Sequence, residues 1–169
     1  MRVLENAMQK VSATPAFARV APSIVPRLDK AVHRLSGGKF MLSQWMLPSL
    51  FLTTTGRRSG EPRTTPLACL PQGGTFLVVG SNFGRTSHPA WTGNLLADAD
   101  AVVEHRGRTV PVRARLLSGG ERTQAWAALL AMWPPYASYQ ARVEREIRVF
   151  RLEPRQVGAT TATGRFDDR

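Results

Sequence analysis

The chain has 169 residues, of which 43% are hydrophobic, and a formal net charge of +11 at pH 7. This length fits one domain, and the apolar content is high enough to bury a core, which excludes a globally disordered chain. The charge comes from 20 arginines against 3 lysines. Guanidinium groups suit phosphate and carboxylate partners, although a GC-rich genome would also favour arginine codons.

The single cysteine, Cys69, lies in an apolar run. It cannot form an intramolecular disulfide, so we expect a buried thiol in a reducing compartment. The N-terminal sequence lacks the long apolar region of a secretory signal. The most apolar stretch, residues 40–52, contains Pro48 and polar residues, and it is short of the ~20 apolar residues that span a bilayer. These features predict a cytoplasmic protein.

Residues 1–46 are predicted to form a basic, amphipathic helical segment. Ile24, Leu28, Val32 and Leu35 share one helical face, and seven lysines and arginines against two acidic residues give this segment a net charge of +5. Such a helix usually packs on its own domain. It can also lie on anionic lipid, which would place the protein peripherally on the inner face of the cell membrane.

Residues 47–154 are predicted to form one mainly β (α+β) domain, followed by a flexible tail over residues 155–169. Strand-like runs occupy residues 49–54, 64–70, 75–80, 101–105, 109–117 and 147–152. In the fifth run, Val110, Val112, Ala114 and Leu116 occupy alternate positions, the pattern of a half-buried strand. Six strands with few helices predict a small closed or split barrel rather than a parallel doubly wound sheet.

Two helices are predicted to interrupt the strands. The first covers residues 89–97. The second begins at Ser118, where Glu121 has the spacing of a capping box, and ends at Pro134 and Pro135.

Several kinds of site are absent from the sequence. It contains no phosphate-binding P-loop, no G-x-G-x-x-G after a strand and no G-x-S-x-G motif. His33, His88 and His105 are scattered, and with one cysteine we expect no metal site. The arginines are dispersed and no recognition helix or RNA-binding motif is present, so we expect no nucleic-acid partner.

The segment TTTGRRSGEPR, residues 53–63, has the composition of an anion-binding loop. Gly56 and Gly60 allow backbone N–H groups to approach a ligand. Arg57, Arg58 and Arg63 can form charge-assisted hydrogen bonds to phosphate or carboxylate. A solvated hairpin with a charged tip is the alternative, and composition alone leaves both open.

Two further segments are candidates for a site. The loop after the third strand, GSNFG at residues 80–84, is followed by a helix start at residues 88–94, and helix N-termini favour anions. The alternative is an ordinary connection between a strand and a helix, with Trp91 in the core. Trp133, Tyr136 and Tyr139 can line a pocket for a planar ligand, or they can belong to the core.

Taken together and in this order, these segments resemble the deazaflavin-dependent nitroreductase family of actinobacteria. The resemblance rests on T-T-T-G-R-R-S-G-E-P-R at residues 53–63, Pro66-Leu67, Gly80-Ser81, Pro89-Ala90-Trp91, Asn94-Leu95 and Tyr136-Ala137-Ser138-Tyr139-Gln140. It covers roughly residues 48 to 154. It implies a split β-barrel of the FMN-binding type with a few flanking helices, adapted to coenzyme F420, a deazaflavin with a phosphate and an oligoglutamate tail.

The resemblance also implies which residues meet the coenzyme. The expected coenzyme contacts are Arg57, Arg58, Ser59, Arg63, Thr64, Thr65, Pro66, Leu67, Ala68, Val79, Gly80, Ser81, Asn82, Ala90, Trp91, Thr92, Gly93, Asn94 and Tyr136. Trp133, Tyr136 and Tyr139 are expected in the substrate pocket, and Tyr136 and Tyr139 as the catalytic residues. FMN in a related barrel remains the alternative cofactor.

The implied activity is transfer of a hydride from reduced coenzyme F420 to a quinone, an enone or a nitro compound. A tyrosine, or a water that it orders, would supply the proton. Two departures affect this expectation: Asn82 stands where the family commonly has a lysine, and Trp133 stands where the nitroreductase has a tyrosine. A non-catalytic protein that binds the coenzyme or lipid at the membrane surface is the other alternative, and the oligomeric state, monomer or homodimer, is open.

Overall fold

The computed structural model describes residues 47–155 together with Thr14, Ala16, Ile24, Leu28 and Ala31. The elements in chain order are β1 (Ser49–Thr55), β2 (Pro62–Gln72), β3 (Thr75–Val79), the short turn η2 (Asn82–Gly84), α3 (Ala90–Ala97), β4 (Asp100–His105), β5 (Arg108–Leu116), α4 (Gly119–Met132), α5 (Pro135–Ala141) and β6 (Val149–Pro154). The tail predicted over residues 155–169 lies outside the described residues, apart from Arg155.

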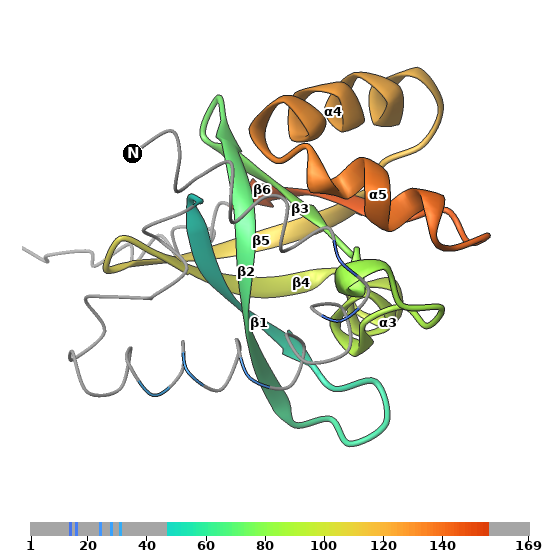
Figure 1. Cartoon of the computed structure of the whole chain (residues 1–169). Coiled ribbons are helices and arrows are strands. Elements are labelled where there is room, and N and C mark those ends of the chain that lie inside the picture. The colour runs from blue at the N-terminus through green and yellow to red at the C-terminus, as the bar shows by residue number, and fades with distance from the viewer. Residues whose placement is uncertain are drawn as a thin grey trace, which may run out of the picture.

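The six strands form a closed antiparallel barrel in the order β1-β2-β3-β6-β5-β4 (Figure 1). Strand β6 inserts between β3 and β5, where Val78 faces Phe150 and Ala114 faces Leu152. The barrel closes through β1 and β4, where Leu52 faces Val103. Full closure leaves no strand edge exposed to another chain. The predicted barrel of six strands with a few flanking helices is confirmed.

Two apolar clusters stabilise this arrangement. The first includes Leu50, Leu52, Val103 and Phe150, and α3 adds Trp91 to it. The second cluster packs α4 and α5 against β3 and β6, and its members include Leu129 and Ile147, both fully buried. Figure 1 shows α4 and α5 together on one side of the barrel. Cys69 is also fully buried, as predicted.

Helix α5 is the element that the sequence analysis did not anticipate. Pro134 and Pro135 end α4, as expected, but a new helix begins at Pro135. Proline is tolerated in the first turn of a helix because the N–H that it lacks has no partner there. The turn that was expected to stop a helix therefore also starts one, and Tyr136 and Tyr139 are helical residues.

Two local predictions are wrong. Ser118 forms no side-chain cap on α4, because Glu121 instead pairs with Arg115 through two hydrogen bonds of 2.6 and 2.8 Å. Leu116, which was expected to point inward, is 42% exposed. Leu117, the next residue, points inward instead and is buried in the second cluster. Its backbone N–H donates to Val149 O at the end of the sheet.

Little of the predicted N-terminal helix can be tested. Ile24, Leu28 and Ala31 are helical, and Ile24 and Leu28 are each 47% exposed, but the helical segment over residues 1–46 stays a prediction. Val32, Leu35 and His33 lie outside the described residues. In the part of the chain that the structure describes, no helix is long and apolar enough to cross a membrane.

Candidate functional site

The β1–β2 loop, residues 56–61, is held in one shape by its own backbone. Gly56 O accepts hydrogen bonds from the N–H groups of Ser59 and Gly60, at 3.1 and 2.7 Å, and Gly56 N donates to Glu61 O at 2.8 Å. A Cβ at position 56 would lie 2.7 Å from Ser59 Oγ and 3.1 Å from Glu61 O. A side chain at position 56 would crowd Ser59 and the Glu61 carbonyl, so the loop is compact rather than an extended hairpin tip.

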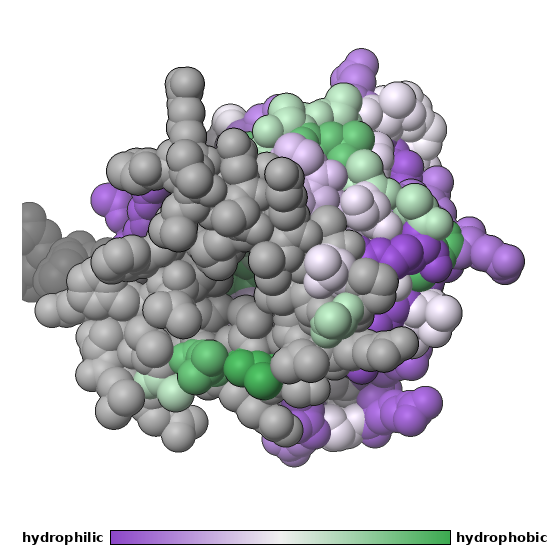
Figure 2. Space-filling model, viewed as in Figure 1, coloured by the Kyte–Doolittle hydropathy of each residue, from purple (hydrophilic) through white to green (hydrophobic). Residues whose placement is uncertain are grey.

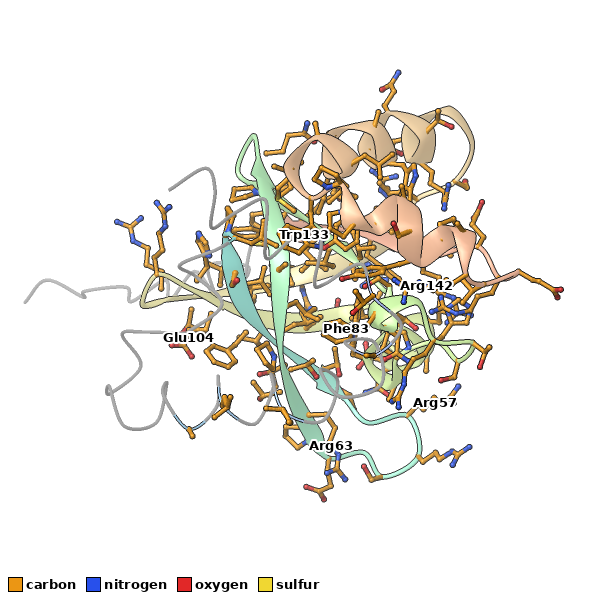
Figure 3. The ribbon with its side chains drawn as sticks, in the orientation of Figure 1. Arg57, Arg63, Phe83, Glu104, Trp133 and Arg142 are labelled. Atoms are coloured by element: carbon orange, nitrogen blue, oxygen red, sulfur yellow. The ribbon has the colours of Figure 1, made fainter. Side chains whose placement is uncertain are left out.

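Three arginines project from this loop and from the start of β2. Arg57, Arg58 and Arg63 are exposed, and Figure 3 places Arg57 and Arg63 at the same end of the barrel. Arg63 Nη2 donates to Ser59 Oγ at 3.3 Å. Within residues 47–155, none of the three forms an ion pair with a carboxylate. Figure 2, in the same view, shows this end as hydrophilic.

Asn94 fixes the loop to α3. Its Oδ1 accepts the backbone N–H of Arg57 at 3.1 Å, and its Nδ2 donates to Thr54 Oγ1 at 3.0 Å. Asn94 is 6% exposed and Thr54 is 2% exposed. The Oδ1 and Nδ2 atoms of Asn94 both bind other protein groups. Asn94 was predicted to contact the coenzyme, and these bonds instead let it position the Arg57 loop.

The guanidinium group of Arg57 lies over α3. A Cβ at Gly93 would meet Nη1, Cζ and Nε of Arg57 at 3.1 to 3.4 Å. The absence of a side chain at Gly93 thus lets the arginine lie close to the first turn of the helix. Of the other predicted contacts on α3, Ala90 is exposed, whereas Trp91 packs on Phe150 with ring centroids 5.7 Å apart and Thr92 is fully buried.

The β3–α3 loop, residues 80–88, contains the next predicted segment. Gly80 N donates to Arg148 O at 2.8 Å, and Gly80 packs against Thr92 of α3. Asn82 and Phe83 adopt left-handed backbone angles, with φ of 48° and 55°. Asn82 Nδ2 donates to Ser87 O at 2.9 Å, so this amide helps to close its own loop.

The predicted contacts on β2 line up beside β1. Thr64 is exposed and Thr65, Pro66, Leu67 and Ala68 are half-buried. Thr64 Oγ1 lies 2.8 Å from Thr53 Oγ1 across the strand pair. Val79, at the end of β3, is buried in the second cluster.

The two tyrosines predicted for the pocket belong to one chain of rings, and Trp133 shares their buried cluster. Tyr136 lies between Trp126 and Tyr139, with ring centroids 6.1 and 6.0 Å apart, and Phe83 lies 6.4 Å from Tyr139. Tyr136, Tyr139 and Trp133 are 5%, 3% and 8% exposed. Burial raises the pKa of Tyr136, with a smaller contribution from Tyr139. Its hydroxyl therefore keeps its proton at physiological pH and is a weaker acid than that of an exposed tyrosine.

Three contacts join the candidate segments. Arg57 meets α3 at Gly93, Gly80 meets α3 at Thr92, and Gly84 meets α5 at Tyr139. The arginine loop, the β3–α3 loop and the tyrosine helix therefore adjoin one another through α3 and η2. No group of three or more His, Cys, Asp or Glu side chains within the described residues could hold a metal ion.

The family model for F420H(2)-dependent quinone reductases matches residues 25–154. The chain belongs to this family. The match spans the whole barrel and its three helices and extends into the N-terminal segment, beyond the region on which the sequence resemblance rests.

The chain is similar in sequence to one named quinone reductase and in structure to two solved proteins. An F420H(2)-dependent quinone reductase of Mycobacterium tuberculosis is 30% identical over 76% of this chain and 89% of its own. A solved F420-H2 dependent reductase is 36% identical, with a TM-score of 0.59 over 63% of this chain and 94% of its own. A second solved structure, described as a domain-swapped dimer, is 32% identical, with a TM-score of 0.62 over 73% and 95% of the two chains.

Sequence reasoning missed two arginines beside the site of this reductase-family chain. Arg145 binds the carbonyl oxygens of the β3–α3 loop, and Arg148 Nη1 donates to Thr92 Oγ1 at 3.1 Å. They lie in R-E-I-R, residues 145–148, which looks like the polar lead into a strand. Only the insertion of β6 beside β3 brings them to Gly80 and Ser81, and no local pattern signals that pairing.

Proposed function

We propose that this chain reduces quinones with reduced coenzyme F420 as the hydride donor. Membership of the quinone reductase family makes coenzyme F420 the cofactor. The observation that carries the proposal is the cluster of Arg57, Arg58 and Arg63 on a loop that Asn94 holds against α3. Exposed guanidinium groups on a fixed loop, with no carboxylate partner in the described residues, suit a phosphate and a glutamate tail.

We assign each part of the coenzyme to the protein segment that is placed to bind it. The β1–β2 arginines and Ser59 would hold the anionic tail. The half-buried face of β2, from Thr65 to Ala68, would support the deazaflavin, together with the backbone of Val79, Gly80 and Ser81. Bound coenzyme F420 would supply a hydride at C5, so the protein has to bind, orient and exclude water rather than create a reactive group.

The proton that follows the hydride is proposed to come from the tyrosines of α5. Burial raises the pKa of Tyr136, so its hydroxyl keeps its proton at neutral pH and is a weak acid. A neutral phenol can donate to a developing quinol oxygen directly or through a water. No carboxylate belongs to the segments assigned to the pocket, so none is proposed as the proton donor. His88 is not proposed either, because its Nδ1 is hydrogen-bonded to Arg145.

Quinones are the proposed acceptors because a flat apolar wall suits a planar, uncharged ring. Trp133, Tyr136 and Tyr139 belong to one buried cluster, and Figure 3 places Trp133 between the barrel and α4–α5. Nitro compounds and enones are electrophiles of the same class and are proposed as secondary acceptors. With tryptophan at position 133 the wall is bulkier and less polar, so we expect nitro substrates to be poor.

The experiment that tests the proposal follows oxidation of reduced coenzyme F420 by absorbance, with menadione, a nitroaromatic and a cyclic enone as acceptors. We expect turnover with menadione and little with the nitroaromatic. A parallel titration with FMN tests the alternative cofactor. Tight FMN binding without binding of coenzyme F420 would overturn the proposal, and coenzyme binding without turnover on any acceptor would favour a non-catalytic binding protein.

A peripheral contact with anionic lipid is a second proposal, carried by one observation. Ile24 and Leu28 lie one helical turn apart and are each 47% exposed, in a segment with a net charge of +5. An apolar stripe with basic neighbours suits the headgroup boundary. Co-sedimentation with anionic vesicles should be lost in the double variant Ile24→Glu, Leu28→Glu, and equal binding by that variant would remove the proposal.

A further inference from the structure

Arg145, in the connection between α5 and β6, uses its whole guanidinium group to hold the β3–α3 loop. Nη2 donates to Ser81 O at 2.9 Å, and Nη1 to Gly80 O at 3.3 Å. Nε and Nη2 both donate to Arg85 O, at 3.1 and 2.9 Å, and Nη1 lies 3.2 Å from His88 Nδ1. One side chain thus bonds four residues of a single nine-residue segment.

This segment has a backbone that needs external support. Asn82 and Phe83 are non-glycine residues with left-handed φ angles, and Gly84 follows with φ of 74°. Left-handed geometry costs roughly 1–2 kcal/mol for each L-residue. Such a strained backbone persists only where contacts with the surrounding structure hold it in place. The carbonyls on either side of this turn, those of Ser81 and Arg85, are two of the three that Arg145 binds.

The opposite side of the turn rests on α5. A Cβ at Gly84 would lie 3.0 Å from Tyr139 Cα and 3.2 Å from Tyr139 O, so the two backbones are in contact. The Phe83 ring lies 6.4 Å from the Tyr139 ring. The loop proposed to meet the coenzyme is therefore held between Arg145 and the helix that carries the proposed proton donors.

We propose that Arg145 is a positioning residue for hydride transfer, which sets the alignment between the coenzyme loop (residues 80–88) and the aromatic wall of α5. The inference rests on the proposed function. Arg145 has no carboxylate partner in the described residues, so its bonds to carbonyls and to His88 are its role in the fold. Its fork geometry matters more than its charge, because a lysine ammonium cannot span four acceptors in fixed directions.

His88 completes the cluster as a neutral acceptor. Its Nδ1 accepts from Arg145 when the imidazole is uncharged. The charged groups that face it are Arg148 and Arg145, and the pKa of His88 is lowered by burial first and then by these two arginines. The imidazole thus stays in the form that the clamp requires at neutral pH.

The test compares Arg145→Lys and Arg145→Met with the wild type. We expect kcat/KM for menadione to fall by about 10- to 100-fold, because a misplacement of ~1 Å can cost that much. The Kd for coenzyme F420, measured by fluorescence without an acceptor, should rise by less than about fivefold, because Gly80 and Ser81 offer only backbone contacts to the deazaflavin and the arginine loop that holds the anionic tail is untouched. Arg115→Lys is the matched control, because Arg115 on β5 also makes several bonds but its partners, Glu121 and Glu153, lie outside residues 80–88.

Hydrogen exchange supplies a readout that needs no turnover. Peptides covering residues 80–88 should exchange faster in both Arg145 variants, while peptides from β1 and β4 stay unchanged. Gly84→Ala disturbs the same turn from the α5 side and should reproduce the kinetic effect if Arg145→Met fails to fold. Wild-type kcat/KM with wild-type exchange in Arg145→Lys would overturn the inference, and so would a loss confined to coenzyme affinity. A wild-type protein without quinone turnover contradicts the proposed function alone, and the exchange experiment still tests the clamp.

Discussion

The backbone N–H of Arg57 donates a hydrogen bond to the side chain of Asn94, 37 residues later in the chain, over 3.1 Å. Through this bond the buried Asn94 of helix α3 fixes the first arginine of the β1–β2 loop. The same amide is anchored on the barrel through Thr54 Oγ1. Pre-organised groups lose less entropy when they bind a ligand, so we expect this bond to strengthen coenzyme binding.

Asn94→Ala should weaken both stability and coenzyme binding. The change leaves the Arg57 N–H without its acceptor, which costs about 1–3 kcal/mol, and frees the loop. We expect a lower melting temperature and a Kd for coenzyme F420 raised by on the order of tenfold. Thr54→Val is the matched control: it removes the other bond of Asn94, lowers the melting temperature and leaves the affinity near wild type. Equal affinities for wild type and Asn94→Ala would contradict the positioning role.

Gly93→Ala should separate stability from binding. An alanine in a helix is up to about 1 kcal/mol more favourable than glycine, but its Cβ would lie 3.1 Å from the Arg57 guanidinium group and displace it. We expect an unchanged or higher melting temperature with weaker coenzyme binding. Gly120→Ala, in the first turn of α4 with no atom within 4 Å of its Cβ, should gain similar stability and keep full affinity. Unchanged coenzyme binding in Gly93→Ala would show that the Arg57 position over α3 is unimportant.

Replacing the two tyrosines singly tests the proton donor. A general acid typically contributes about 10²–10⁴-fold, so Tyr136→Phe should lower kcat for menadione by roughly 100-fold, and Tyr139→Phe by less. Because burial raises the Tyr136 pKa, wild-type kcat should show no loss from tyrosine ionisation up to about pH 10, the ordinary tyrosine value. A double Tyr→Phe variant with wild-type kcat would rule out both side chains.

Much of the barrel could be predicted from sequence, because its signals are local. Alternation and turn residues located all six strands, and the threonine–arginine–glycine segment was recognised as a candidate loop. Helix α5 was missed because Pro134 and Pro135 were interpreted only as a stop. The capping box at Ser118 was wrong because Arg115 competes for Glu121 from a neighbouring strand. Arg145 could not be found, because its partners lie 57 to 65 residues away.

Cys69 should be inert towards thiol reagents, including the quinone substrates themselves. Burial raises its pKa to about 12, so the nucleophilic thiolate is scarce at pH 8. We expect no iodoacetamide or menadione adduct by mass spectrometry on the folded protein, and full labelling in denaturant. An adduct formed on the native protein would show that the barrel opens readily around β2.

The most direct measurement is the Kd of two ligands for two proteins. The ligands are coenzyme F420 and the same deazaflavin without its phosphate and glutamate tail. Each is titrated against the wild type and against Arg57→Ala. Removing one charge-assisted contact should raise the Kd for coenzyme F420 by about 10- to 100-fold. The tailless deazaflavin should bind more weakly than coenzyme F420 and should not distinguish the two proteins. Equal affinity of the wild type for both ligands, or an unchanged Kd for coenzyme F420 in Arg57→Ala, would contradict the arginine loop as the site that holds the anionic tail.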